Sequence, residues 1–386
     1  MKKTLIALAA LAATGAAFAQ SSVTLYGRLD AGYANSVRTQ EVAGGATNEA
    51  KLLGVNSHNS VSSYWGITGT EDLGGGLKAG FKLEQDVFTA NGNTGSSGAN
   101  LGAASSGAFD RTSLVSLEGN FGTVAFGRDY VPTFSLIAAN DIFGQTRLTT
   151  VGLAAGVGSS VDKQFMYTTP NFSGFVGKLS VGNTDGSSTG SDVTARNNNL
   201  SLSYANGPLN VGFGWGTQEA VGNGQAAIAA TTFTTINGST NAVAAGTTTK
   251  AELSALTAAY DFGSFKLLGN YITTKYNPNT ANSLDTTRTE YNFGAVVPVG
   301  KVNLLAQIGR NTFSSNVAAT TGDSSGTDWA LGADYALSKR TTLYVKTGVV
   351  NKFDGTAAAN SQSVNATTVN GNTKLTETNF GVRHTF

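Results

Sequence analysis

Val23-Thr24-Leu25-Tyr26-Gly27-Arg28-Leu29-Asp30-Ala31-Gly32-Tyr33 is the stretch on which the fold of this chain depends. Its odd-numbered positions carry the apolar side chains, and its even-numbered positions carry Thr24, Tyr26, Arg28 and Asp30. A period of two residues is typical of a β-strand with one apolar and one polar face. The stretch therefore predicts a strand with one face toward an apolar environment and the other toward water.

The same alternation recurs along the chain, at 77–86, 175–181, 200–204, 209–215, 291–297, 329–337 and 343–349. Two kinds of connection alternate between these strands. Seven are short turns, at 71–76, 119–122, 170–174, 206–208, 261–264, 298–300 and 337–340. Eight are long and polar, at roughly 38–59, 89–108, 129–160, 183–196, 218–250, 277–287, 314–326 and 352–373. These fifteen connections predict sixteen strands of about ten residues each.

Composition distinguishes between the two β-architectures that such a pattern allows, a membrane barrel and a soluble β-sandwich. Charged residues are only 13% of the chain, glycine is abundant at 49 of 386 residues, and cysteine is absent. A soluble β-sandwich would carry dense charge on its polar face, whereas here that face is mostly Thr, Ser, Asn and Gly. Aromatic residues gather beside the short turns, as in an interfacial girdle. We therefore predict an all-β, 16-stranded antiparallel transmembrane β-barrel with short periplasmic turns and long extracellular loops.

Proline placement agrees with this strand count, because proline cannot donate to a β-ladder. Pro132, Pro170, Pro208, Pro278 and Pro298 are all expected in connections. A repetitive surface adhesin is the alternative suggested by the Gly, Ser, Thr and Asn content, but no repeat of fixed period runs through the chain.

The first residues have the three parts of a secretory signal peptide. Lys2 and Lys3 form a basic start, 4–17 is apolar, and Ala17-Phe18-Ala19 matches a cleavage site. We predict a signal peptide at 1–19 and the barrel at 20–386; a buried N-terminal helix is the alternative.

A barrel of this size encloses a water-filled lumen that side chains alone cannot fill. The connection 129–160 is more apolar than an exposed loop should be. We predict that this third long loop folds into the lumen as a constriction loop. Packing at a subunit contact or over the barrel mouth is the alternative.

Charges on the polar face of the strands are expected to line the lumen and to set ion preference. Strand parity points basic residues inward at Arg28, Lys78, Lys82, Lys178, Lys346 and Arg383, and acidic residues at Asp30, Glu84, Asp86, Asp334 and Glu377. Asp129 and Asp141 would add acid from the loop. Strict parity turns Arg111 toward lipid, so a bulge or a position beyond the strand would be needed to turn it inward. For each charge the alternative is a hydrated lumen position far from the narrowest point.

Several motifs together resemble the general porins of beta-proteobacteria. They are Ser22–Gly27, Gly69–Gly80, Gly119–Val124 with Gly127–Asp129, Tyr167–Phe172, Leu337–Thr341 and Gly381–Phe386. The resemblance runs over essentially the whole chain. It implies a sixteen-stranded homotrimeric barrel, a third loop inside the pore, and passive diffusion of ions and small hydrophilic solutes. It also implies that Phe386 is recognised by the barrel-assembly machinery.

The chain departs from the family in its second strand. Porins of this type often carry two arginines there, which favour anions, and this sequence has Tyr64 and Thr68 in their places. Arg111 and Arg128 match basic positions of the family. We therefore add Tyr64, Thr68 and Arg128 to the candidate pore-lining residues and leave anion or cation preference open.

The predicted function is a general diffusion porin of a Gram-negative outer membrane, in contact with lipid and without cofactor, metal or enzymatic activity. A substrate-specific channel or an adhesin-like barrel are the alternatives. A barrel enzyme is a weaker one, because nucleophilic hydrolysis usually needs a histidine beside its nucleophile. His58 is expected in a polar loop and His384 on the lipid-facing side. A formal charge of +1 disfavours a nucleic-acid partner.

Overall fold

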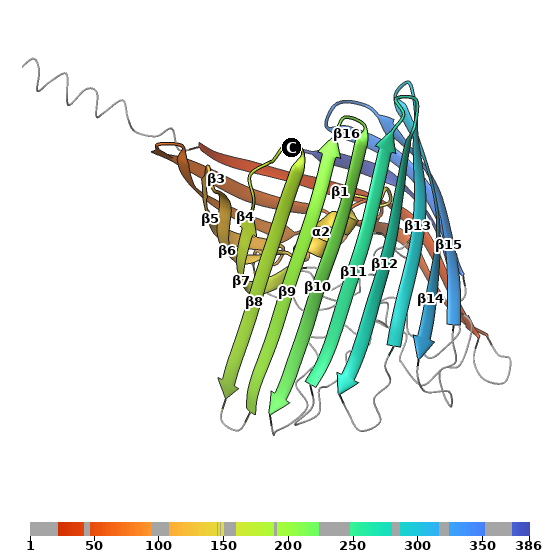
Figure 1. The fold of residues 1–386 in the computed structure, drawn as a ribbon. Coiled ribbons are helices and arrows are strands. Elements are labelled where there is room, and N and C mark those ends of the chain that lie inside the picture. The colour runs from red at the N-terminus through yellow and green to blue at the C-terminus, as the bar shows by residue number, and fades with distance from the viewer. Residues whose placement is uncertain are drawn as a thin grey trace, which may run out of the picture.

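The computed structural model describes residues 22–41, 47–94, 108–144, 146, 148–149, 160–188, 191–223, 248–279, 286–315, 324–351 and 373–386. The predicted signal peptide at 1–19 lies outside these residues. The described residues form one antiparallel sheet that curves round on itself (Figure 1). None of the described helices is long and apolar enough to cross a membrane.

The first half of the chain contributes β1 (Ser22–Glu41), β2 (Thr47–Ser57), β3 (Tyr64–Gly74), β4 (Leu77–Asp86), β5 (Thr112–Gly119), β6 (Gly122–Tyr130), the helix α2 (Pro132–Ala138), β7 (Ser160–Thr168) and β8 (Phe175–Ser188). The second half contributes β9 (Ser191–Asn206), β10 (Leu209–Asn223), β11 (Thr248–Asp261), β12 (Lys266–Asn279), β13 (Thr286–Val299), β14 (Val302–Ser315), β15 (Ser324–Ala336), β16 (Thr341–Asn351) and β17 (Thr373–Thr385).

The sheet closes where the two ends of the chain meet. β1 pairs with β17 in antiparallel register, from Arg28 opposite Thr385 to Gln40 opposite Thr373. The last residue extends the seam, because Gly27 and Phe386 exchange backbone hydrogen bonds of 3.1 and 3.0 Å. Closure leaves the wall without a free edge, which is the condition for a β-structure inside lipid.

Seventeen strand segments make sixteen positions in the barrel wall, as predicted. β2 pairs with the second half of β1, from Ala31 to Glu41, while β3 pairs with its first half, from Ser22 to Arg28. β2 and β3 are thus two parts of one wall strand, separated by residues 58–63. The expectation of a long polar loop at 38–59 was wrong, because polar residues there pair in a ladder.

Burial is inverted relative to a soluble protein, which confirms the predicted alternation. Val23 and Leu25 on β1 are 67% and 61% exposed, whereas Asp30, further along the same strand, is fully buried. On β14 Ile308 is 62% exposed, while Asn199 on β9 and Asn379 on β17 are fully buried. Apolar residues outside and amides inside suit a wall between hydrocarbon and water.

The short turns are built by glycines that adopt left-handed backbone conformations. Gly207 has a φ of 55° between β9 and β10, and Gly300 has a φ of 62° between β13 and β14. Only glycine takes these angles without steric cost, so the chain can reverse within two or three residues. The turn before β16 uses a side chain instead, because Ser338 Oγ accepts the N–H groups of Arg340 and Thr341.

Strands on the β8–β15 side are longer than the predicted ten residues. β9 has 16 residues and β10 has 15, so each extends into sequence that we expected to be loop. Pro278 and Pro298 consequently lie inside β12 and β13, although each is the second-last residue of its strand. Thr and Asn pair as well as apolar residues do, and nothing in their pattern marks where the hydrocarbon ends.

Aromatic rings cluster beside the short turns, as predicted for a membrane interface. Phe175 lies 4.3 Å from Tyr204, measured between ring centroids, and Phe262 lies 4.6 Å from both Tyr260 and Phe265. These rings are on the exposed side of the wall; Phe175 is 59% exposed.

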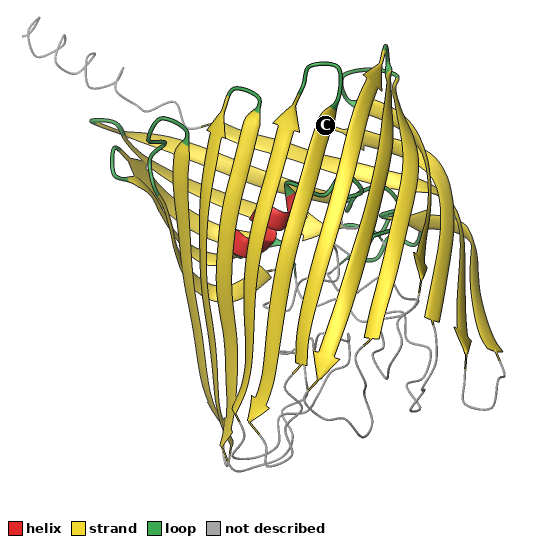
Figure 2. Ribbon diagram, turned by 45° about the vertical axis from the view of Figure 1, so that its right-hand side comes forward, coloured by secondary structure: helices red, strands yellow, loops and turns green. Residues whose placement is uncertain are grey.

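The connection after β6 begins with α2, which contacts β8, β9, β10 and β11 (Figure 2). Thr133 Oγ1 donates to Asn199 Oδ1 at 2.6 Å, and Asn270 Nδ2 donates to the carbonyl of Asn140 at 3.1 Å. A little further on, Phe143 and Leu148 pack with Leu305 in a small buried cluster. The wall residues in these contacts, Asn199, Asn270 and Leu305, are all buried.

We expect Gly122→Ala to destabilise the barrel by more than about 1 kcal/mol, because an alanine would need the same positive φ and would also clash with backbone. Gly122 has a φ of 102°, and a Cβ there would meet the carbonyl oxygen of Thr168. Gly75→Ala is the matched control, since Gly75 has a φ of 62° but open space around it. Urea unfolding of the refolded proteins in liposomes measures both; equal midpoints would contradict this account of the turn.

Candidate functional site

Three adjacent wall strands bring polar side chains to one level of the barrel. Arg28 on β1 is opposite Tyr64 on β3, and Tyr64 is opposite Asp86 on β4. Parity had predicted that Arg28 and Asp86 share the inward face. Asp86 is 8% exposed and Arg28 is half-buried, in agreement with that direction.

Arg111 joins this group from the residue just before β5. Its Nη1 lies 2.5 Å from Asp86 Oδ1, and its Nε lies 3.6 Å from Glu84 Oε2. Its backbone N–H donates to the carbonyl of Glu84. The side chain points inward because the residue precedes the strand, where the alternation of faces does not yet apply. A position beyond the strand is one of the two arrangements that the sequence allowed for an inward-facing Arg111; the other was a bulge.

Tyr64 lies between two guanidinium groups. Its ring centroid is 5.3 Å from Cζ of Arg28 and 4.6 Å from Cζ of Arg111. Arg111 is also 5.3 Å from the ring of Tyr130, which stacks on Phe134 at 5.1 Å. The negative faces of aromatic rings reduce the repulsion between neighbouring cations, so two arginines can stay close together.

Glu84 is the acidic centre of the group. Tyr26 Oη donates to its Oε1 at 2.7 Å, and Lys82 Nζ lies 2.8 Å from the same oxygen. Glu84 is 5% exposed. The carboxylate therefore offsets the charges of Lys82 and Arg111.

Asp30 fixes the break between β2 and β3 to the wall. Its Oδ1 accepts the N–H groups of Asn59 and Ser60 at 2.9 and 3.4 Å, and the hydroxyl of Tyr344 at 3.0 Å. Ser63 Oγ in turn accepts the N–H of Asp30. The predicted lumen charge is thus fully buried and holds the 58–63 segment in place.

A second basic group stands on the neighbouring strands. Arg383 Nη2 lies 3.3 Å from Asp334 Oδ2, and its Nη1 donates to Ser60 Oγ at 3.2 Å. Lys346 is only 2% exposed, with its Nζ 5.4 Å from the ring centroid of Phe143. Asp141 is also buried, and its Oδ1 accepts the N–H of Phe143.

Of the other candidate residues, Thr68 and Lys78 make different contacts, and Arg128 lies at the edge of the Arg111 group. Thr68 donates to the carbonyl of Phe81, and Lys78 is exposed opposite Asp72 and Glu118, near a short turn. Arg128 is at the far end of β6, where it contacts Asp162 at 2.6 Å.

Asp129 lies next to Arg128 but has a different neighbour. Its Oδ1 accepts the hydroxyl of Thr112 at 2.8 Å. Arg128 Nε donates to the carbonyl of Asp110, and Asp110 Oδ1 accepts the N–H of Asp86 at 3.1 Å. The structure therefore brings Arg28, Tyr64, Glu84 and Arg111 together, with Arg128 and Asp129 beside them.

Three partners in these groups were missed. Tyr26 and Tyr344 bind carboxylates through their hydroxyls, and Tyr130 stacks beside Arg111. Parity places Tyr26 on the polar face, which is a usable signal. Tyr130 follows a register shift at Gly127–Asp129, and no local pattern in the sequence predicts that shift.

The arrangement can attract, pair with and release ions, since its charges are fixed in a water-facing wall. His58 Nε2 lies 3.0 Å from the carbonyl of Val87, and His384 Nδ1 lies 2.9 Å from the hydroxyl of Thr341. The part of the chain that the structure describes contains no group of three His, Asp or Glu residues arranged to hold a metal ion.

Comparison with known proteins gives the same answer throughout. Residues 4–356 match the family model described as Gram-negative porin. Outer membrane porin protein 32 of Delftia acidovorans is 34% identical, with all of both chains covered. The solved anion-selective porin from Comamonas acidovorans is 30% identical with a TM-score of 0.69, over 95% of this chain and 100% of that one. The trimer form of OmpT from Vibrio cholerae shares the fold, with 16% identity and a TM-score of 0.63 over 95% and 99% of the two chains.

A closed sixteen-stranded wall, an inverted distribution of polarity and matches over the whole chain leave one assignment. The chain belongs to the Gram-negative porin family and is a general diffusion porin of the outer membrane, a channel without enzymatic activity.

Proposed function

We propose that the 129–160 connection narrows the pore and that solutes pass between it and the wall made by β1, β3 and β4. The contacts of Thr133 with Asn199 and of Phe143 with Leu305 support this, because both wall residues are buried on the inward side. The loop then lines the wall from β9 to β16 and leaves the Arg28 group as the opposite side of the opening.

We further propose a weak preference for anions, carried by Arg28. Among the described residues Arg111, Lys82 and Arg383 each lie within 4 Å of a carboxylate, while Arg28 forms no such ion pair. Its Nε donates to the carbonyl of Ser62, a neutral partner, so its charge is not offset by an ion pair at short range among the described residues. A pore radius below the Debye length of about 8 Å lets such a charge act across the whole opening. The related porin described as anion-selective supports the same direction.

Removal of this charge should change ion preference. We expect Arg28→Ala to lower the anion-to-cation permeability ratio by about twofold, because one fixed cation leaves the narrow zone. Reversal potentials in planar bilayers under a KCl gradient measure the ratio. Lys78→Ala removes the same charge near the short-turn rim and should leave the ratio almost unchanged. Equal shifts in both variants would contradict a special role for Arg28.

The loop position can be tested with a disulfide, because the chain has no cysteine of its own. We expect Thr133→Cys combined with Asn199→Cys to cross-link in the folded barrel, since the two native side chains are in hydrogen-bond contact. Thr133→Cys with Leu202→Cys is the control, because Leu202 is on the exposed face. Mass spectrometry of the oxidised proteins identifies the bond. An uncross-linked Thr133–Asn199 pair in correctly folded protein would reject the constriction loop.

We also propose that three chains assemble side by side and that Phe386 is the residue recognised during assembly, as the resemblance implies. Exposed apolar residues along β1, such as Val23 and Leu25, support a buried lateral contact. The trimer should conduct in groups of three equal steps. Single steps only, with a monomeric mass in detergent, would argue against it.

A further inference from the structure

Residues 58–63, between β2 and β3, are too many for the place that they occupy in the wall. The ladder of β1 with β2 ends at Ala31 and the ladder of β1 with β3 begins at Arg28, so only two residues of β1 lie opposite these six. The surplus has to leave the plane of the sheet. None of the six is exposed, and three are buried: Asn59, Ser60 and Ser63. Because outward side chains of this wall are exposed, the segment projects inward.

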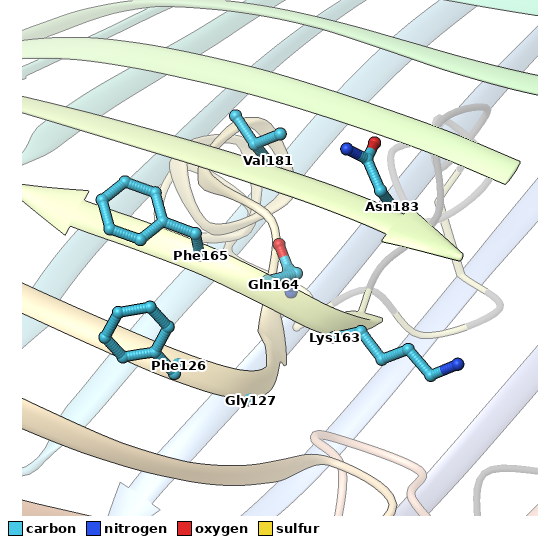
Figure 3. A pocket seen from close by; sticks show the side chains of 7 residues that line it. All are labelled: Phe126, Gly127, Lys163, Gln164, Phe165, Val181 and Asn183. Carbon is cyan, nitrogen blue, oxygen red and sulfur yellow. The ribbon is translucent and has the colours of Figure 1, made fainter. Parts of the chain in front are cut away.

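A second irregularity in the wall, between β6 and β7, does not have this character. The register shifts there between Gly127 and Asp129, and the extra residues Asp162 and Lys163 are exposed. In Figure 3 the Lys163 side chain extends away from the two phenylalanine rings, and a pocket of about 410 Å³ lies beside it. An irregular segment of this barrel can therefore stay open, so the burial of 58–63 depends on contacts of its own.

Two inward-facing arginines donate hydrogen bonds to the segment. Arg28 Nε donates to the carbonyl of Ser62 at 3.1 Å, and Arg383 Nη1 donates to Ser60 Oγ at 3.2 Å. Arginine side chains are long and lose much rotamer freedom when they are held in one place. The position of 58–63 therefore determines where these two positive charges lie.

The same segment touches the 129–160 connection. A Cβ atom added to Gly144 would lie 2.7 Å from the carbonyl oxygen of Ser60 and 2.9 Å from Val61 Cγ1. From the wall, Asn379 Nδ2 donates to the carbonyl of Asn59 at 3.3 Å. Residues 58–63 thus contact both the wall and the connection that we propose to narrow the pore.

Asp30 anchors the segment to β1. Its Oδ1 accepts three hydrogen bonds, two from backbone N–H groups of the segment and one from the hydroxyl of Tyr344. Its own backbone N–H and carbonyl both bond to Ser63 Oγ, at 2.8 and 3.1 Å. Loss of the carboxylate would leave buried donors without an acceptor, which is unfavourable. The segment would then move to find water for them.

We propose that 58–63 is a second lumen-narrowing segment and that Asp30 is its positioning residue, which keeps Arg28 and Arg383 at the opening. The inference rests on the proposed anion preference, because it explains what holds the cations in the narrow zone. Asp30 is fully buried and Arg28 is half-buried. Passing ions can contact the arginine but not the carboxylate, so an acidic residue favours anions through the arginines that it positions.

Two substitutions of Asp30 separate position from charge by the direction of their effects. Asp30→Asn removes the charge and keeps an Oδ1 acceptor, so the anion-to-cation permeability ratio should rise or stay level. Asp30→Ala removes the acceptor as well, so the ratio should fall about twofold, as for Arg28→Ala, and the single-channel conductance should rise. Planar bilayers under a KCl gradient measure both quantities, on protein whose folding is verified by heat-dependent gel mobility.

A third variant tests the anchor without any change of formal charge. Tyr344→Phe removes one of the three donors to Asp30 and keeps the ring, so the ratio should fall by a smaller factor. Tyr167→Phe is the matched control, because its hydroxyl donates to the carbonyl of Phe121 at a short turn. Equal ratios for the two tyrosine variants would contradict the anchor, even where Asp30→Ala folds poorly.

A ratio that rises in both Asp30 variants would overturn the proposal, because charge alone would then explain the effect of Asp30. An unchanged conductance of folded Asp30→Ala would do the same for the narrowing role. The proposed anion preference fails separately, if Arg28→Ala leaves the ratio unchanged. In that case the conductance of Asp30→Ala still decides whether 58–63 narrows the lumen.

Discussion

Hydrocarbon offers no hydrogen-bond partner to a peptide group, and this constraint shapes the whole molecule. A strand in lipid must pair on both sides, so the last strand has to meet the first. The seam from Arg28–Thr385 to Gln40–Thr373, completed by Gly27 and Phe386, meets that requirement. Closure leaves no unpaired edge in the lipid, and the two-residue period of each strand then puts one face of the wall toward lipid and the other toward the interior.

Closure also explains why charge is sparse and concentrated. Outward positions must be apolar, so charged side chains are confined to the inner face and the rims. On the inner face they meet one another at short range, as Arg111 meets Asp86 at 2.5 Å. Tyr64 separates Arg28 from Arg111 without adding charge. Among the described residues, most of the inward charges near Arg28 are paired in this way, and Arg28 itself has no carboxylate within 4 Å.

Local chemistry predicted the wall well and its irregularities poorly. The alternation in residues 23–33 and the glycine-rich turns follow from strand geometry and positive φ, and both are readable from sequence. The break at 58–63 is not, because it depends on Asp30, a residue distant in sequence that binds Asn59 and Ser60. The polar ends of the long strands were predicted as loops, because runs of Thr and Asn occur in both strands and loops.

The sequence predicted which face of the wall each site residue occupies, but not which side chains it contacts. Parity assigns Arg28 and Glu84 to the lumen, but the contacts of Arg111 arise from its place before β5, and those of Arg128 from a bulge in β6 and β7. Both irregularities are set by long-range pairing. The same bulge places Asp162 and Lys163 together opposite Arg128.

Conductance tests the central claim most directly, namely that the closed wall surrounds a continuous column of water. Purified, folded protein in a planar bilayer should give stable ohmic steps whose size rises in proportion to salt concentration. A correctly folded barrel that carries no current, or a current that saturates at low salt as in a tight binding site, would contradict the account.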